Sequence, residues 1–269
     1  MSVPLDAGDP AAVKALQERA ARAQPAEHVE VAGGWRLRHA PDCAWWLGAA
    51  LPHGPAEPKG VSGLEHRLAR AEDFYTRRGA AALLQISPGA CPEELDTVLA
   101  ERGYGRRGSL SLQAALSSAV RGHAPATGPL RVRVDDRPTP AWFDAWTAVH
   151  GRTADGAGPE KAMLARVRNR SAYARAFLGD TAVAVGRAAA DTGWTGIFSM
   201  ATLPEARGSG AARSVLAALA KWAQEQGTGR MYLQVERENA AALRLYQGVG
   251  FTEVCGYHYR ASQYLAEPG

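Results

Sequence analysis

The sequence predicts an α/β protein of two domains that repeat one order of elements. Its 269 residues exceed one typical domain, and its 46% hydrophobic content is that of a globular chain. The clearest order runs from Ile197 to Phe251, where an alternating strand, a glycine turn, an amphipathic helix, a short strand and a second helix follow one another. A similar order precedes Gly103-Tyr104 in the first half. We infer a tandem duplication from this repeat.

The first half repeats the element order of the second half but lacks several of its residues. Periodicity predicts helices over 11–23, 63–78 and 92–102, and strands over 29–31, 35–38, 44–51 and 82–86. Matching Gly103-Tyr104 with Gly250-Phe251 places Leu99 where Tyr246 stands, Pro92 where Asn239 stands, and residues 59–62 where the glycine turn 207–210 stands. The tyrosine, the asparagine and the second glycine of the turn are therefore missing from the first copy.

A segment rich in proline and glycine separates the two copies. Residues 120–129 have no apolar period, so we predict domains over 1–125 and 129–269. The second domain should contain a strand over 130–134, helices over 140–149 and 161–170, a hairpin of 172–178 with 181–189, and strands over 197–202 and 231–236.

The glycine turn after the strand 197–202 favours an anion site. Gly208 and Gly210 let the backbone curl, and the unpaired amides of the following helix start carry partial positive charge, which suits a pyrophosphate. A P-loop is excluded because Ala211 follows Gly210 where a lysine is required. A dinucleotide-binding turn would need a glycine where Arg213 stands. A tight turn that binds nothing remains an alternative.

The residues after this turn carry a more specific pattern. It comprises Pro204, Arg207-x-x-Gly210-x-Ala212, Val235, Asn239, Ala242, Leu245-Tyr246 and Gly250-Phe251. In order and spacing these residues resemble the GNAT superfamily of N-acetyltransferases, over about residues 130–260. The resemblance implies an α+β fold of two tandem domains, each a mixed, mostly antiparallel central sheet flanked by helices. It also implies that acetyl-coenzyme A lies where the sheet opens between its fourth and fifth strands.

The resemblance assigns a role to each matching residue. The backbone of Met200, Ala201 and Thr202 would bind the pantetheine, and the pyrophosphate would rest on Arg207, Gly208, Ser209, Gly210, Ala211 and Ala212. Asn239 and Tyr246 would lie near the thiol end. The resemblance implies no metal.

Acetyl transfer to an amine also needs a proton donor and a base. Tyr246 could give the proton to the departing thiolate, although Ala242, Tyr246 and Val249 also form a stripe that would suit a helix core. Glu236 is the nearest carboxylate able to take the proton of the amine, and an exposed residue near a helix start is an equal alternative. His258 is a weaker candidate, since a strand histidine beside tyrosines more often packs or hydrogen-bonds.

Composition and charge narrow the partners and the location expected for this protein. The net charge of +4 is modest and its arginines are scattered, so we expect no nucleic acid partner, and no apolar run approaches a membrane span. Cys43, Cys91 and Cys255 lack metal or disulfide spacing, which favours free thiols and a cytoplasmic location. We expect an enzyme that acetylates a small-molecule amine, with a homodimer left open. The alternative is a non-catalytic acyl-coenzyme A sensor or interaction module.

Overall fold

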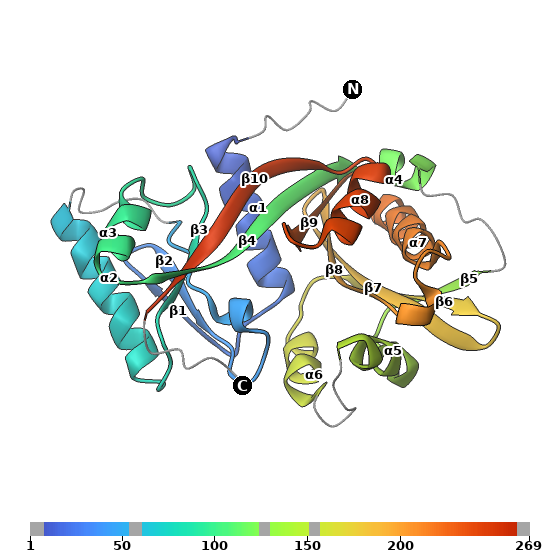
Figure 1. Cartoon of the computed structure of the whole chain (residues 1–269), viewed down its shortest axis with the longest axis horizontal. Coiled ribbons are helices and arrows are strands. Elements are labelled where there is room, and N and C mark those ends of the chain that lie inside the picture. Colours follow the sequence, from blue (N-terminus) through green and yellow to red (C-terminus); the bar gives the residue numbers. More distant parts are fainter. Residues whose placement is uncertain (1–7, 54–60, 124–129, 151–156, 263–269) are drawn as a thin grey trace. The chain divides into compact units, whose positions relative to one another are not determined.

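The computed structural model describes residues 8–53, 61–123, 130–150 and 157–262 (Figure 1). The chain divides into two compact units, which are treated separately below. Unit 1 comprises residues 1–111 and 254–269, and unit 2 comprises residues 112–253. Each unit therefore has its own arrangement of helices around strands.

Unit 1 begins with a helix and a hairpin. It contains α1 (Pro10–Ala23), β1 (His28–Ala32), β2 (Trp35–His39), the 3-10 helix η1 (Trp45–Gly48), α2 (Val61–Thr76), β3 (Leu83–Ile86), α3 (Leu95–Glu101) and the first part of β4 (Gly105–Leu116). Strands β1 and β2 pair antiparallel, with His28 opposite His39. The core of unit 1 is apolar and aromatic, and Trp35, Phe74 and Leu99 are fully buried in it.

The last strand of the chain belongs to unit 1. Strand β10 (Thr252–Ala261) pairs antiparallel with β3, with His258 opposite Ile86 and Ala261 opposite Leu83. The strand order in unit 1 is β3-β10-β4. The sequence therefore returns to the first unit after it has completed the second.

Unit 2 is built around a mixed sheet. Its elements are the end of β4, α4 (Ser117–His123), β5 (Arg131–Asp135), α5 (Pro140–His150), α6 (Gly158–Ala165), β6 (Ser171–Leu178), β7 (Thr181–Asp191), β8 (Trp194–Thr202), η3 (Pro204–Ala206), α7 (Ala211–Glu225), β9 (Arg230–Glu236) and α8 (Ala240–Gly248). The strand order is β4-β9-β8-β7-β6-β5. Pairs from β5 to β8 are antiparallel, whereas β8 and β9 are parallel.

The two faces of this sheet carry different helices. On one face, Val215 and Leu219 of α7 approach Gly186 of β7 so closely that a β-carbon there would collide with the Val215 side chain. On the other face, the Trp142 indole of α5 packs edge-on against Tyr173 of β6. Residues of β7, β8 and β9 alternate between the α7 face and the α5 face.

The fold class predicted from the sequence is confirmed, and most elements lie where expected. Three local predictions were wrong. Residues 44–51 form η1 and two isolated bridges instead of a strand, the helix expected over 161–170 ends at Ala165, and residues 120–123 of the expected linker belong to α4. Strand β4 was not predicted at all.

The division into units differs from the single cut expected near residues 125–129. The predicted boundary itself falls outside the described residues. The observed cuts lie within β4, after Ser111, and within β10, before Val254, because these two strands run from one unit into the other. We expected residues 1–125 to be structural or to form a wall of the acceptor site, and residues 129–269 to bind acetyl-coenzyme A and to catalyse. Both roles stay predictions.

Candidate functional site

The parallel strands β8 and β9 of unit 2 separate from each other before either strand ends. Paired positions run from Trp194 opposite Arg230 to Ile197 opposite Leu233. Beyond that row, β8 continues to Thr202 and β9 to Glu236 without further pairing to each other. The backbone groups of residues 198–202 that face β9 are therefore available to a ligand lying between the strands.

A bulge in β8 lies at the start of this opening. The register shifts so that Phe198 faces Arg187 and Ala201 faces Val185, which leaves Ser199 and Met200 opposite Gly186 alone. Ser199 adopts a positive φ of 53°, a conformation that costs free energy in a residue with a side chain. Bulges are common beside binding sites because they redirect the backbone. Sequence analysis missed Ser199, since nothing in its neighbours signals a left-handed residue.

The glycine turn closes the end of the opening at the start of α7. Gly208 and Gly210 have φ values of 81° and 86°, and Gly210 caps the N-terminus of α7 in a left-handed conformation. A β-carbon at either glycine would meet nothing within 4 Å. The glycines are therefore needed for the backbone path and leave open space in front of the helix.

The amides of the turn do not all point to that space. The amides of Arg207 and Ser209 donate to the carbonyls of Pro204 and Ala206, at 3.2 Å and 3.3 Å, and the Ser209 hydroxyl donates to the Ala206 carbonyl at 2.6 Å. The first hydrogen bond within α7 runs from the Ser214 amide to the Gly210 carbonyl. The amides of residues 211–213 thus have no acceptor within the helix.

The other predicted cofactor residues lie around the same opening. Met200, Ala201 and Thr202 form the last part of β8, and the sulfur of Met200 approaches Gly186 on the α7 face. Asn239 is the N-cap of α8, where its side chain accepts from the Ala242 amide at 3.0 Å. This hydrogen bond gives Asn239 a structural role in the helix start.

Tyr246 and Glu236 lie on opposite faces of the sheet. Tyr246 is 7% exposed in α8 and packs with Val235 and Phe251 on the α7 face. Glu236 is exposed at the end of β9 and follows Tyr232 and Gln234 by alternation, so it lies on the α5 face. Burial raises the pKa of Tyr246 to about 12, so its hydroxyl is protonated at neutral pH.

His258 lies in unit 1 and is engaged there. Its Nε2 lies 2.9 Å from the Asp96 carboxylate, to which Arg260 also donates at 2.7 Å. Burial lowers the pKa of His258, and the hydrogen bond to Asp96 offsets this only in part. The expectation of a packing or hydrogen-bonding role fits these contacts.

The described residues also limit other chemistry. Among them, no group of three or more His, Cys, Asp or Glu side chains is arranged to hold a metal ion. None of Cys43, Cys91 and Cys255 forms a disulfide. No helix in the described part of the chain is long and apolar enough to cross a membrane.

Comparisons with known proteins place this geometry in a family. The family described as "Probable histone acetyltransferase Rv0428c C-terminal" matches residues 10–260. The curated relative "Uncharacterized N-acetyltransferase YobR" of Bacillus subtilis is 26% identical over 253 residues, which cover 92% of this chain and 98% of that protein.

Solved structures share the fold at low sequence identity. A GCN5-related N-acetyltransferase from Kribbella flavida has a TM-score of 0.72 at 19% identity, covering 95% of this chain and 96% of its own. A tandem GNAT protein from the clavulanic acid biosynthesis pathway has a TM-score of 0.65 at 10% identity, covering 87% and 79%. A GCN5-related N-acetyltransferase from Sphaerobacter thermophilus has a TM-score of 0.61 at 15% identity, covering 97% and 95%.

Proposed function

Because the chain belongs to the family described as "Probable histone acetyltransferase Rv0428c C-terminal", within the GNAT N-acetyltransferases, we propose that it moves an acetyl group from acetyl-coenzyme A to a primary amine of a small molecule. The observation that supports this most is the opening between β8 and β9 past Ile197 and Leu233, with the glycine turn at its end. Free strand edges suit the amides of a pantetheine, and the turn with the start of α7 suits a pyrophosphate.

The fit to acetyl-coenzyme A rests on open space as well as on polar groups. No atom lies within 4 Å of a β-carbon built at Gly208 or Gly210, so phosphate oxygens would have room in front of the α7 amides. Two of the predicted contacts change: the amides of Arg207 and Ser209 are used within the turn. We assign pyrophosphate binding to the amides of Gly208, Gly210, Ala211 and Ala212.

The cosubstrate supplies an activated acyl group, and the chain must manage two protons. Tyr246 is the proposed donor to the departing thiolate, and Glu236 the proposed acceptor from the amine, directly or through water. Their positions on opposite faces of the sheet are compatible with this division, because the two proton transfers involve different atoms, the amine nitrogen and the thioester sulfur.

The amine makes a base necessary. An alkyl amine with a pKa of about 10.4 is neutral in about one molecule per thousand at pH 7.4, which costs about 4 kcal/mol. Glu236 is exposed at the edge of the opening and can reach water there. Glu236→Gln should therefore lower turnover most below the pKa of the amine, and much less at high pH where the free amine is abundant.

The activity test is thiol release from acetyl-coenzyme A with a panel of amines. The family description names histone as a substrate, so the panel should include a lysine-rich basic peptide beside small amines. Glu238→Gln, two residues away and also exposed, is the matched control for Glu236→Gln. Tight binding of acetyl-coenzyme A with no turnover on any amine would instead support the sensor. A cytoplasmic location and a role of the first copy as a wall of the acceptor site stay predictions.

A further inference from the structure

Strand β1 forms a free edge of unit 1. Among the described residues it pairs with β2 alone. In unit 2, the hairpin of β6 and β7 is followed by β8, α7 and β9, and in unit 1 the hairpin of β1 and β2 is followed by the bridges at residues 50–51, by α2 and by β3. Strand β5 covers the edge of β6. The equivalent strand of unit 1, β1, has no such neighbour in the described part of the chain.

The backbone of β1 presents hydrogen-bonding groups to this free edge. Arg36 of β2 exchanges two hydrogen bonds with Leu51 on its far side, at 3.0 Å and 2.8 Å. Its amide and carbonyl are therefore turned away from Val31, which lies opposite Arg36 in β1. In an antiparallel pair this arrangement alternates along the strand. Val31 and Val29 thus direct their amides and carbonyls outward, away from β2.

Apolar side chains accompany these backbone groups. Val31 is 65% exposed and Val29 is 50% exposed, and no other large hydrophobic residue in the described ranges is exposed as much. The two side chains lie on one face of β1, because they are two residues apart. A free strand edge with exposed apolar side chains pairs readily with another strand unless charge or a cover prevents it.

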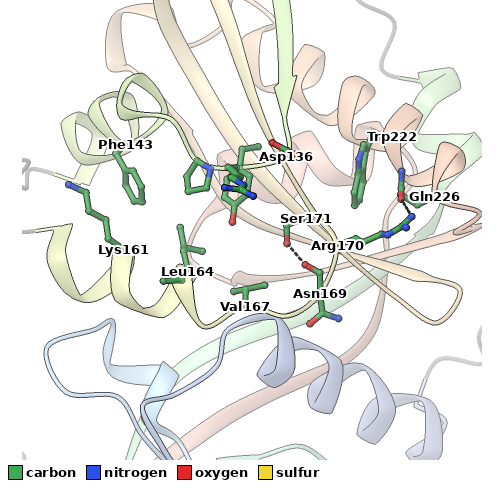
Figure 2. Close-up of a pocket in the computed structure, with 14 residues that line it drawn as sticks. Asp136, Phe143, Lys161, Leu164, Val167, Asn169, Arg170, Ser171, Trp222 and Gln226 are labelled. Atoms are coloured by element: carbon green, nitrogen blue, oxygen red, sulfur yellow. Dashed lines mark hydrogen bonds between the residues drawn. The ribbon is translucent and has the colours of Figure 1, made fainter.

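The edge strand of unit 2 is protected by charge. Arg131 and Arg133 are exposed along β5, so two copies of this edge would repel each other. Past the end of β5 lies an open groove of about 850 Å³, where Arg137, Lys161 and Arg170 add further positive charge. Figure 2 shows Lys161 and Arg170 in this groove. Strand β1 carries no such row of like charges.

The charges beside β1 suit a second copy of the same strand. Glu30 points to the face opposite the valines, and its carboxylate lies 3.5 Å from Arg70 and 3.6 Å from Arg77 of α2. Two such strands paired about Glu30 would bring two carboxylates opposite each other, which by itself is unfavourable. The guanidinium groups of both copies would lie around these carboxylates and offset the repulsion.

We propose that this protein forms a homodimer in which β1 pairs antiparallel with β1 of a second copy, about a twofold axis at Glu30. Val29 then lies opposite the partner's Val31, and Val31 opposite the partner's Val29. All the outward amides and carbonyls of the two valines find partners in this register, and the valine side chains pack in cross-strand pairs. The sheet continues across the axis as β2-β1-β1-β2. This inference concerns assembly and does not rest on the proposed activity.

Sedimentation equilibrium of the full chain tests the assembly. We expect a reversible dimer with a Kd on the order of 10–100 µM, because two five-residue strands give an interface at the low end of the usual size range. Val31→Lys should raise the Kd at least about 10-fold, since a lysine on a strand edge opposes pairing. Val134→Lys changes an exposed valine of β5 and should keep the wild-type Kd. Circular dichroism checks that both variants fold.

Cysteine substitutions test the register. When chains with Val29→Cys and chains with Val31→Cys are mixed and oxidised with diamide, a mixed disulfide should form, because α-carbons directly opposite each other lie about 5.5 Å apart. Either variant alone should cross-link much less, since its two cysteines lie diagonally, about 7–8 Å apart. The wild type gives the background from Cys43, Cys91 and Cys255. Peptide mass spectrometry identifies the linked positions.

The outcomes are decisive in both directions. Selective cross-linking in the mixture, with a dimer weakened by Val31→Lys and kept in Val134→Lys, supports the proposal. A full chain that remains monomeric up to its solubility limit overturns it. A dimer that persists unchanged in Val31→Lys, or cross-linking that is equal in the mixture and in either variant alone, also overturns it. Thiol release enters none of these measurements, so the acetyltransferase proposal is tested separately.

Discussion

The burial of Tyr246 changes the free energy of proton transfer that its residue type alone would predict. With an ordinary pKa of about 10, a tyrosine would transfer a proton to a thiolate of pKa near 8.5 at little cost. Burial raises the pKa of Tyr246 to about 12, so the same transfer to an ordinary thiolate costs roughly 5 kcal/mol. Transfer from Tyr246 therefore requires that the same buried surroundings also raise the pKa of the thiol.

Tyr246→Phe separates proton donation from packing. The ring stays against Phe251 within the same apolar cluster, so stability should change little, while turnover should fall by about 100-fold to 10,000-fold. Cofactor affinity should be nearly unchanged. Tyr257→Phe, which removes a buried tyrosine hydroxyl in unit 1, is the matched control. Near-native turnover in Tyr246→Phe would show that the thiolate leaves without this donor.

His53 is a buried titratable group outside the candidate site. It is 4% exposed, and neither ring nitrogen has a hydrogen-bond partner among the described residues. Burial, together with the nearby charges of Lys14 and Arg36, lowers its pKa to about 4. Below pH 6.5 the unfolded chain takes up a proton that the folded chain refuses, so the free energy of unfolding falls as pH decreases towards 4.

His53→Leu should flatten this pH dependence. Between pH 7.5 and pH 5 the wild type should lose roughly 2 kcal/mol of stability through His53, and the variant should not. Urea unfolding at a series of pH values measures the difference. His66→Leu removes an exposed histidine of α2 and controls for the general effect of losing an imidazole. If the free energy of unfolding changes with pH equally in the wild type and in His53→Leu, His53 is not the source of the pH dependence.

At the scale of elements, the glycine turn is where backbone conformation and charge can be tested apart. Gly210 has a φ of 86° and open space around it, so any side chain there strains the backbone by roughly 1–2 kcal/mol without colliding. Aspartate enters this conformation more readily than alanine. If Gly210→Asp loses more affinity for coenzyme A than Gly210→Ala does, the additional loss is therefore due to the negative charge in the proposed pyrophosphate space.

We expect Gly210→Asp to weaken coenzyme A binding at least about 10-fold more than Gly210→Ala, as measured by calorimetry. Gly227, beyond the other end of α7, has a φ of 73° and equally open space, so Gly227→Asp is the matched control for strain and added charge. If Gly210→Asp and Gly227→Asp bind coenzyme A with equal affinity, the glycine turn is not the phosphate site.

Sequence patterns predicted the elements of the candidate site well because those elements carry strong local signals. The alternating strand before Leu203, the glycines of the turn and the stripe of α7 each satisfy one local rule. Residues 44–51 failed because a continuous apolar run does not distinguish a strand from other buried segments. The open groove of unit 2 lined by Arg137, Lys161 and Arg170 was missed because its residues come from two loops, β6 and three helices, far apart in sequence.

At the scale of the whole molecule, the duplication predicts the repeat of elements but not which strands pair. Ala50 forms a parallel bridge with Leu84, as β8 does with β9 in unit 2. Strand β10, which follows α8, nevertheless pairs with β3, and β4, which follows α3, neighbours β9. The strands that follow α3 and α8 are thus exchanged between the two copies. Local sequence does not indicate this exchange, because either strand satisfies the same apolar pattern.

The exchange makes the second half dependent on the first. A fragment beginning at Gly128 lacks β4, the neighbour of β9, and lacks β3, the partner of β10. Strand β9 would then end the sheet with exposed hydrogen-bonding groups beside the candidate site, and β10 would be a second unpaired strand.

We expect the fragment from Gly128 to aggregate, or to show less than about one tenth of the activity of the full chain in thiol release. Size-exclusion chromatography and circular dichroism report its folding. A fragment from Leu112 keeps the end of β4 and is the matched comparison, because it restores the neighbour of β9 without restoring the rest of unit 1. If the strand beside β9 is what the second half lacks, the longer fragment should recover solubility first. A soluble and fully active fragment from Gly128 would show that unit 2 folds and catalyses without the exchanged strand.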